Sequence, residues 1–321
     1  MGNDNVGGPN PLPEGDIALW RKVRRRFYWL LVALLLQGAD LVPPAAGRRF
    51  GAGLAGLALK LRPRDRRVAA ANLARAFPEL DGPGRERLLK DSATAMGRNL
   101  FDTLAAGRLL DQGDYVMEEP DAGMPRVGDL LAELAAPGQG VFILTGHLGC
   151  WELLGAWLAR ELRRRGLDGL GVVTGTVHNP PVDRLLQSRR RDLGMTVLPR
   201  DEGAGPLLRY LQGGGIVAIL QDQYTRTRNL DVPFFGEPAP TPVGLARLAL
   251  RYDIPVVPVA MARDQRTNRQ RVVHLPPLEF KKGGSGDDDV KGFLALCNSR
   301  LEYFIRRNPA EWVWFHQRWS Q

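Results

Sequence analysis

Residues 141–152, which read VFILTGHLGCWE, place a histidine and a carboxylate directly behind a short apolar run. The strand-like run ends at Thr145, and Gly146 permits a tight turn before His147. Glu152 follows five residues later, where the spacing of apolar residues predicts an amphipathic helix. The pattern therefore predicts a strand, a turn and a helix, with both polar side chains at the carboxyl end of the strand. Open α/β sheets bind their ligands at that end of their strands.

The alternation of strand and helix continues to the end of the chain. Strand-like runs also cover residues 170–174, 216–220, 254–261 and 272–275, and helical patterns cover residues 151–165, 181–193, 206–212, 241–252 and 290–307. Thr241 and Pro242 predict one helix start, because a hydroxyl cap followed by proline is typical of that position. Such alternation indicates an α/β fold with a mostly parallel sheet flanked by helices. We expect this α/β domain to cover residues 111–321.

The N-terminal part of the chain has a different pattern. Residues 1–16 are rich in glycine, proline and asparagine and are predicted to be disordered. Residues 17–110 have helical spacing of apolar residues, and no strand signal precedes residue 140. We therefore expect an N-terminal helical region that packs on the α/β domain without a linker.

A membrane anchor is predicted within this helical region, over residues 27–42. Five of the six residues 21–26 are cationic, and an uncharged run covers residues 27–36. The run is shorter than the roughly 20 residues that a membrane span needs, and residues 37–40 contain no convincing signal-peptide cleavage site. An anchor in the plane of the cytoplasmic face fits the aromatic and arginine content of this segment. A buried core helix is the alternative.

Composition narrows the class of protein. The 321 residues carry a formal net charge of +9, which favours an anionic partner such as a membrane surface or a phosphorylated lipid. Two cysteines do not make a disulfide framework. The four histidines are scattered, without the spacing of a zinc site, so we expect no metal. No Gly-x-Ser-x-Gly motif supports a serine hydrolase.

His147 and Glu152 suit acid–base chemistry. The carboxylate can orient the imidazole as a general base, and main-chain amides near Gly149 and Cys150 can stabilise an oxyanion at the start of the helix. A structural histidine bonded to a nearby acid explains the same residues. Cys150 is a second candidate nucleophile with His147 as its base, although a buried, inert thiol is the simpler interpretation.

Other polar residues follow the strand 216–220. Asp222 and Gln223 lie at its carboxyl end, and Arg226 and Arg228 follow in the next loop, where arginines are often simply solvated. The aromatic pair Phe234 and Phe235 suits core packing or the wall of an acyl-chain site. The tryptophans of residues 312–319 fit a membrane interface and a core cap equally well.

Several of these blocks together resemble one family. In order and spacing the chain is similar, from about Arg21 to Trp319, to the late acyltransferases of lipid A biosynthesis, the lauroyl and myristoyl type within the glycerolipid acyltransferase fold. The similar blocks are Asn72-Leu73 with Ala76-Phe77-Pro78-Glu79, His147 to Glu152, Asn179-Pro180-x-x-Asp183 with Arg190-x-x-x-Gly194, Asp222-Gln223, Val232-Pro233-Phe234-Phe235-Gly236 with Thr241, and Trp312-x-Trp314-x-His316-x-Arg318-Trp319.

The resemblance implies an O-acyltransferase with an acyl carrier protein or coenzyme A thioester as co-substrate and no other cofactor. His147 would take a proton from a hydroxyl of a phosphorylated glycolipid, most simply a lipid A precursor, and Glu152 would orient His147. The residues implied in substrate binding are Asn179, Asp183, Arg190, Asp222, Gln223, Arg226 and Arg228. The implied location is the cytoplasmic face of the inner membrane.

Three alternatives to this function stay open. Related family members acylate phosphatidylinositol mannosides, so another glycolipid can be the acceptor. A Cys150-dependent acyl hydrolase needs the thiol as nucleophile. A basic membrane-binding protein without chemistry would bind in a salt-dependent manner, whereas a nucleic-acid partner is not expected, because the positive charge is dispersed along the chain.

Overall fold

A seven-stranded sheet forms the centre of the molecule. The computed structural model describes residues 14–113, 115–118, 120, 123–136, 138–175, 179–225 and 227–319. The strands follow the order β1-β9-β8-β2-β5-β3-β4, and they cover β1 (Val116–Glu118), β2 (Val141–Thr145), β3 (Leu170–Thr174), β4 (Met195–Pro199), β5 (Ile216–Leu220), β8 (Val256–Arg263) and β9 (Gln270–His274). All neighbours are parallel except β8 and β9. The prediction of a mostly parallel α/β sheet is confirmed.

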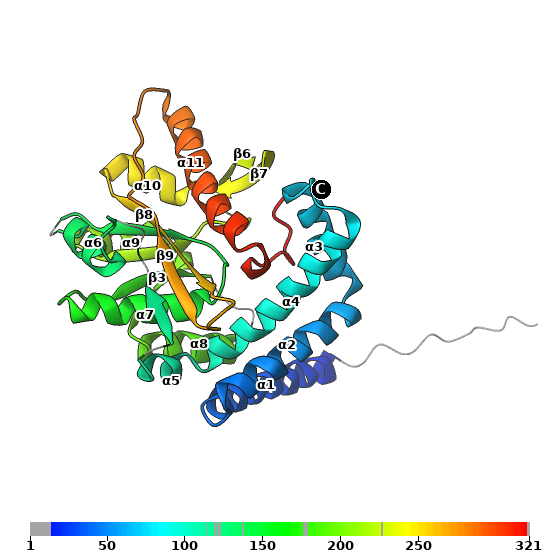
Figure 1. Cartoon of the computed structure of the whole chain (residues 1–321). Helices are drawn as coiled ribbons and strands as arrows, with labels where there is room; N and C mark the ends of the chain where they lie inside the picture. The colour runs from blue at the N-terminus through cyan, green and yellow to red at the C-terminus, as the bar shows by residue number, and fades with distance from the viewer. Residues whose placement is uncertain are drawn as a thin grey trace, which may run out of the picture.

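Helices cover both faces of this sheet (Figure 1). In β2, Val141 and Ile143 belong to one buried cluster, whereas Phe142 and Leu144 belong to the other. The first cluster includes side chains of α5 (Ala106–Asp111), α6 (Val127–Leu134) and α7 (Trp151–Arg164). The second includes side chains of α9 (Ala204–Gln212), α10 (Gly244–Tyr252) and α11 (Gly286–Arg307). A strand that is buried on both faces needs an uninterrupted apolar run, which residues 141–144 supply.

Some elements differ from the sequence-based expectation. β1 precedes residue 140, β4 was not predicted, and Thr241 and Pro242 lie in a hairpin of β6 (Asn229–Phe234) and β7 (Glu237–Pro242) instead of starting a helix. The hydroxyl of Thr241 donates to the carbonyl of Ala239 at 3.0 Å, so it does not cap α10, which begins at Gly244. The same hydroxyl accepts from Asn298 and Arg318, so contacts with distant residues replace the local capping role.

The first four helices of the chain are α1 (Glu14–Ala39), α2 (Pro44–Leu61), α3 (Pro63–Ala76) and α4 (Gly82–Leu104). They gather on one side of the molecule (Figure 1). α2 and α4 approach closely, because a Cβ atom at Gly51 would lie 2.2 Å from the carbonyl oxygen of Gly97. Buried Asp102 of α4 forms ion pairs with Arg48 of α2 and Arg263 of β8, which connects the helices to the sheet.

An apolar face runs along α1 and α2. Its exposed side chains are Phe27, Leu30, Leu31, Leu34, Leu35, Phe50, Leu54, Leu57 and Leu61. Within the described ranges, no helix combines the length and apolarity needed to cross a membrane. The predicted disordered segment 1–16 lies outside the described residues up to position 13, and its last three residues begin α1.

Candidate active site

The register of β2 and β5 brings His147 and Asp222 together. The two strands are parallel neighbours, with Thr145 opposite Leu220. Two residues beyond this pair, Nδ1 of His147 lies 2.9 Å from Oδ1 of Asp222, and the main-chain amide of His147 donates to Oδ2 at 2.7 Å. Gly146 permits this approach, because a Cβ atom there would lie 3.0 Å from Cγ of Asp222. The site therefore lies at the carboxyl edge of the sheet, as predicted.

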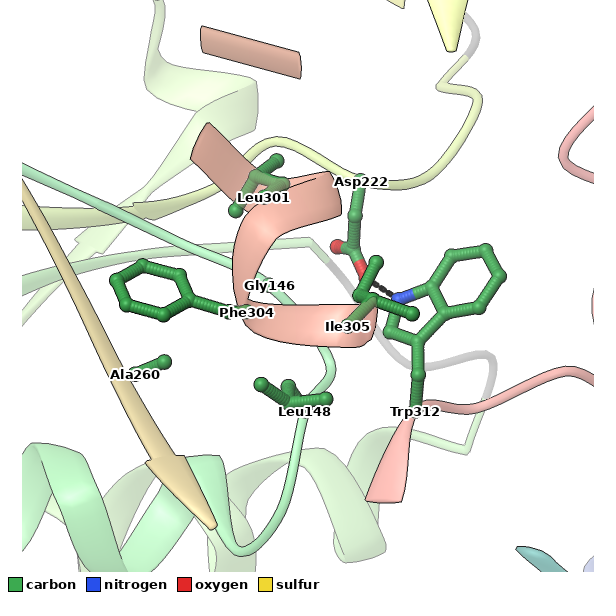
Figure 2. A pocket seen from close by; sticks show the side chains of 8 residues that line it. All are labelled: Gly146, Leu148, Asp222, Ala260, Leu301, Phe304, Ile305 and Trp312. Carbon is green, nitrogen blue, oxygen red and sulfur yellow. Dashed lines mark hydrogen bonds between the residues drawn. The ribbon is translucent and has the colours of Figure 1, made fainter. Parts of the chain in front are cut away.

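Asp222 is fully buried and ionised. Burial acts to raise the pKa of Asp222, but the neighbouring His147 and the hydrogen bonds that His147 and Trp312 donate outweigh it, so this pKa lies well below its usual range. The indole Nε1 of Trp312 donates to Oδ2 at 2.7 Å (Figure 2). An ionised carboxylate only accepts hydrogen bonds, so Nδ1 of His147 carries the proton and Nε2 is the basic nitrogen.

Glu152 contacts Arg190 instead of His147. Both carboxylate oxygens of Glu152 accept from the Arg190 guanidinium, with Nε at 3.1 Å from Oε2. Burial acts to lower the pKa of Arg190, but the hydrogen bond and charge of Glu152 outweigh it and raise this pKa. The predicted role of Glu152 in orienting His147 has no hydrogen bond to support it in the structure, because the first turn of α7 directs Glu152 toward Arg190 of α8 (Pro180–Asp192). The ring of His147 instead meets that of Trp151, with centroids 4.9 Å apart.

The amide of Gly149 has a structural partner. It donates to the carbonyl of Glu311 at 2.9 Å, so the expectation that it serves an oxyanion is wrong. Gly149 has a φ of 61°, and a Cβ atom there would lie 2.0 Å from the carbonyl oxygen of Met261. Only glycine fits this turn, which presses the His147 loop against β8 and the C-terminal segment.

A large cavity opens beside His147. Its volume is about 1080 Å³, and His147, Trp151, Glu152 and Arg190 line it. β3 and β5 are paired only from Leu170 to Val172 of β3. After Val172 the two strands are no longer paired, and the cavity there is lined by side chains from both faces of the sheet. The α7 side is formed by Leu154, Gly155, Leu158 and Met195, and the opposite side by Leu207, Leu245 and Leu248. A mostly apolar cleft with a few convergent polar groups is typical of a substrate site.

Comparison with known proteins identifies the chain. The family model described as bacterial lipid A biosynthesis acyltransferase matches residues 18–321. The chain belongs to this acyltransferase family. The acyltransferase is 26% identical over 313 residues to the lipid A biosynthesis lauroyltransferase of Escherichia coli (strain K12), and the alignment covers 96% of each chain. It is also 26% identical over 270 residues to the phosphatidylinositol mannoside acyltransferase of Mycobacterium tuberculosis (strain CDC 1551 / Oshkosh), covering 77% of this chain and 80% of that protein.

Two of the remaining predicted site residues of the acyltransferase line the cavity, whereas Asn179 and Asp183 do not belong to its lining. Gln223 and Arg228 line it, and Arg228 also forms an exposed ion pair with Asp287 at 3.2 Å. Asn179 precedes α8, and the amide of Asp183 donates to its carbonyl oxygen at 2.9 Å. Arg226 lies outside the described residues. In the described part of the acyltransferase, no group of three or more metal-ligating side chains comes together.

Cys150 of the acyltransferase is buried in the helical layer. Its sulfur contacts the hydroxyl of Thr103 at 3.4 Å and the carbonyl of Asn99 at 3.5 Å. Burial raises the pKa of the Cys150 thiol to about 12. A thiol that holds its proton at neutral pH is a poor nucleophile, which disfavours the thiol-dependent alternative.

Trp312 was not predicted as a site residue, although its indole contacts Asp222. The sequence signals it only through the tryptophan-rich ending of the chain and the resemblance of that ending to the family.

Proposed function

We propose that this acyltransferase moves a fatty acyl chain from a thioester to a hydroxyl of a phosphorylated glycolipid, with His147 as general base and Asp222 as its orienting carboxylate. The observation that carries the proposal is the contact between His147 and buried Asp222 at the edge of the large cavity. The donor is acyl carrier protein or coenzyme A, and no further cofactor is required.

The reaction follows from the orientation of the imidazole, whose Nδ1 faces Asp222 and leaves Nε2 as the base. Nε2 of His147 takes the proton of the acceptor hydroxyl while the oxygen of that hydroxyl attacks the carbonyl carbon of the thioester. Asp222 stabilises the resulting imidazolium through Nδ1. The tetrahedral intermediate collapses, the carbon–sulfur bond breaks, and the leaving thiolate takes the proton from Nε2. The products are an ester and a free thiol, and His147 returns to its starting state.

The apolar cavity fits the acyl chain of the donor. Trp151, Gly155 and Leu158 lie at spacings of four and three residues on the cavity side of α7, so they form an apolar path that leads away from His147. Arg190, Arg200 and Arg228 also line the cavity, and guanidinium groups suit the phosphates of an acceptor. Asn179, Asp183, Gln223 and Arg226 remain proposed acceptor contacts.

A lipid A precursor is the first choice of acceptor. The lauroyltransferase relative is covered over 96% of its length, compared with 80% for the phosphatidylinositol mannoside acyltransferase, while both are 26% identical. The mannoside lipid is the second choice, because of that equal identity. Both acceptors are phosphorylated glycolipids with a free hydroxyl, so the same His147 chemistry applies.

We also propose that the apolar face of α1 and α2 lies in the cytoplasmic surface of the inner membrane. Exposed leucines and phenylalanines on both helices would enter the boundary of the acyl chains. Exposed Arg49, Lys60, Arg62 and Arg64 would contact anionic lipid headgroups. This arrangement would keep the enzyme close to a lipid acceptor.

Acyl transfer by the purified protein tests the function. Lauroyl thioesters of acyl carrier protein and of coenzyme A are offered with a lipid A precursor or a phosphatidylinositol mannoside, and products are identified by mass spectrometry. We expect transfer to one acceptor, abolition by His147→Ala, and little change in Cys150→Ala. Transfer at the wild-type rate by the His147 variant, or to neither acceptor by the wild type, would contradict the proposal.

A further inference from the structure

The C-terminal segment is joined to the loop that carries His147. Leu148 and Trp312 form an antiparallel bridge, with the amide of Gly149 donating to the carbonyl of Glu311 at 2.9 Å and the amide of Val313 donating to the carbonyl of His147 at 3.2 Å. This bridge places the indole of Trp312, which is 1% exposed, behind the carboxylate of Asp222.

Oδ2 of Asp222 has two fixed donors. The main-chain amide of His147 and Nε1 of Trp312 each donate to it at 2.7 Å, whereas Oδ1 accepts from Nδ1 of His147. Fixing Oδ2 from two directions restricts rotation of the carboxylate, so Oδ1 stays aimed at the imidazole. The carboxylate must also remain charged when His147 becomes an imidazolium, and donors to its charged form favour this state.

The surroundings of Asp222 make the indole N–H hard to replace. Figure 2 shows the Trp312–Asp222 contact beside the end of α11, with Leu301, Phe304 and Ile305 around it. A void of about 10 Å³ adjoins the contact, and its other lining residues are also apolar or glycine: Gly146, Leu148 and Ala260. His316 and Arg318 also act electrostatically on Asp222, but His316 contacts the carbonyl of Val313 and Arg318 donates to Pro240 and Thr241. A buried carboxylate that loses a donor in such surroundings is destabilised by its missing hydrogen bond.

We propose that Trp312 is a positioning residue of the acyltransferase, whose indole N–H holds Asp222 in the orientation that activates His147. This inference rests on the proposed function for its kinetic consequence, but not for its effect on the titration of His147. Tryptophan suits the role because its indole nitrogen only donates and adds no charge to the buried pair.

A matched pair of variants separates positioning from core packing. Trp312→Phe removes the indole that reaches Asp222. Trp314→Phe is the control, because Trp314 is equally buried, its ring centroid lies 4.5 Å from that of Trp312, and its Nε1 donates to the carbonyl of Pro309 at 2.7 Å instead. Replacing Trp312 by benzothienylalanine, which has sulfur in place of the N–H, removes the donor but keeps the shape of the ring. The ring then fills the space that a substitute water molecule would need.

The first measurement is the NMR titration of His147, with its resonances assigned by their loss in His147→Gln. Without the indole donor, Asp222 is held less firmly opposite Nδ1, so the midpoint of the His147 titration should move away from that of the wild type in both Trp312 variants. In Trp314→Phe it should match the wild type. A Trp312 variant that keeps its fold and titrates like the wild type would refute the inference, whether or not the protein transfers acyl groups.

The second measurement is the dependence of kcat and KM on pH. We expect kcat on the plateau to fall about tenfold to a hundredfold in the Trp312 variants, with KM little changed and the acid limb displaced from its wild-type position. Equal losses in the Trp312 and Trp314 variants, with unshifted acid limbs, would assign Trp312 to packing alone. An inactive wild type would count against the proposed function only, because the titration is read without turnover.

Discussion

Nδ1 of His147 lies 2.9 Å from Oδ1 of Asp222, although 75 residues separate them in the chain. The contact exists because β2 and β5 are parallel neighbours in register, so the residues that follow both strands meet at one edge of the sheet. The carboxylate that is close in sequence, Glu152, is instead held by Arg190. The two carboxylates therefore have separable effects on the chemistry of His147.

Asp222→Asn should reduce kcat far more than Glu152→Gln. An amide at position 222 cannot stabilise the imidazolium and can favour the wrong tautomer of His147, so we expect a loss of about 10²- to 10⁴-fold. Glu152→Gln should act mainly through the position of Arg190 and raise KM for the acceptor. Initial rates over a range of both substrates distinguish these outcomes.

The Asp222 assignment has a clear point of failure. If Glu152→Gln abolished kcat while Asp222→Asn retained it, the orienting carboxylate would be Glu152 after all. The control tests whether Glu152 acts through Arg190. If the two residues act as a pair, the double variant Glu152→Gln with Arg190→Gln should lose little more activity than either single variant.

The stability of the protein should depend on Asp222 through pH. The pKa of Asp222 is lower in the folded protein than in the unfolded chain, so its ionisation contributes stability that is complete above the unfolded value of about 3.9. That contribution is lost as pH falls toward the folded value. Denaturant unfolding should therefore show Asp222→Asn less stable than the wild type at pH 7, with the difference shrinking below about pH 4. A difference that stayed constant across this range would contradict the low folded-state pKa.

The sequence predicted β2 and the start of α7 well, because both depend on local signals. An apolar run fully buried on both faces and the turn at Gly146 mark the end of β2 without reference to any distant residue. β4 was missed because it lies at the edge of the sheet, where Thr196 and Val197 are only partly buried and the apolar signal is weak. β1, with three residues, is too short for a period to be detected.

The candidate site divides in the same way. His147 could be found from its own turn, and Asp222 was recognised as a polar residue at the end of a strand. Their pairing depends on the strand order, with β5 beside β2, and local periodicity does not contain that information. Glu152 was assigned in place of Asp222 because proximity in sequence was the only proximity available. The hydrogen bond from Trp312 likewise depends on the pairing of the C-terminal segment with the His147 loop. Trp312 follows His147 by more than 150 residues, so local sequence does not predict this pairing.

Membrane binding should depend on the apolar face of α1 and α2. Leu54 and Leu57 are 50% and 52% exposed, and their joint replacement by glutamine removes apolar area without altering the buried side of α2. We expect binding to vesicles of phosphatidylethanolamine and phosphatidylglycerol, measured by co-sedimentation, to weaken by about tenfold or more. Tyr252→Gln on α10, far from α1 and α2 in Figure 1, is the matched control and should bind like the wild type. Equal binding by all three proteins would remove this face from the proposal.

The length of the transferred acyl chain should depend on Gly155. This glycine lines the α7 side of the cavity, and a Cβ atom there would lie 2.9 Å from Sδ of Met195. Gly155→Leu should fill the path beyond Trp151, so that shorter acyl thioesters become the better donors, by about tenfold or more in relative kcat/KM. Competition between thioesters of different length, with products separated by mass, measures this preference. Gly244→Leu is the control, because Gly244 lines the cavity from α10 and a Cβ atom there would meet nothing within 4 Å. A shift in chain length with Gly244→Leu, and none with Gly155→Leu, would place the acyl chain on the opposite side of the sheet.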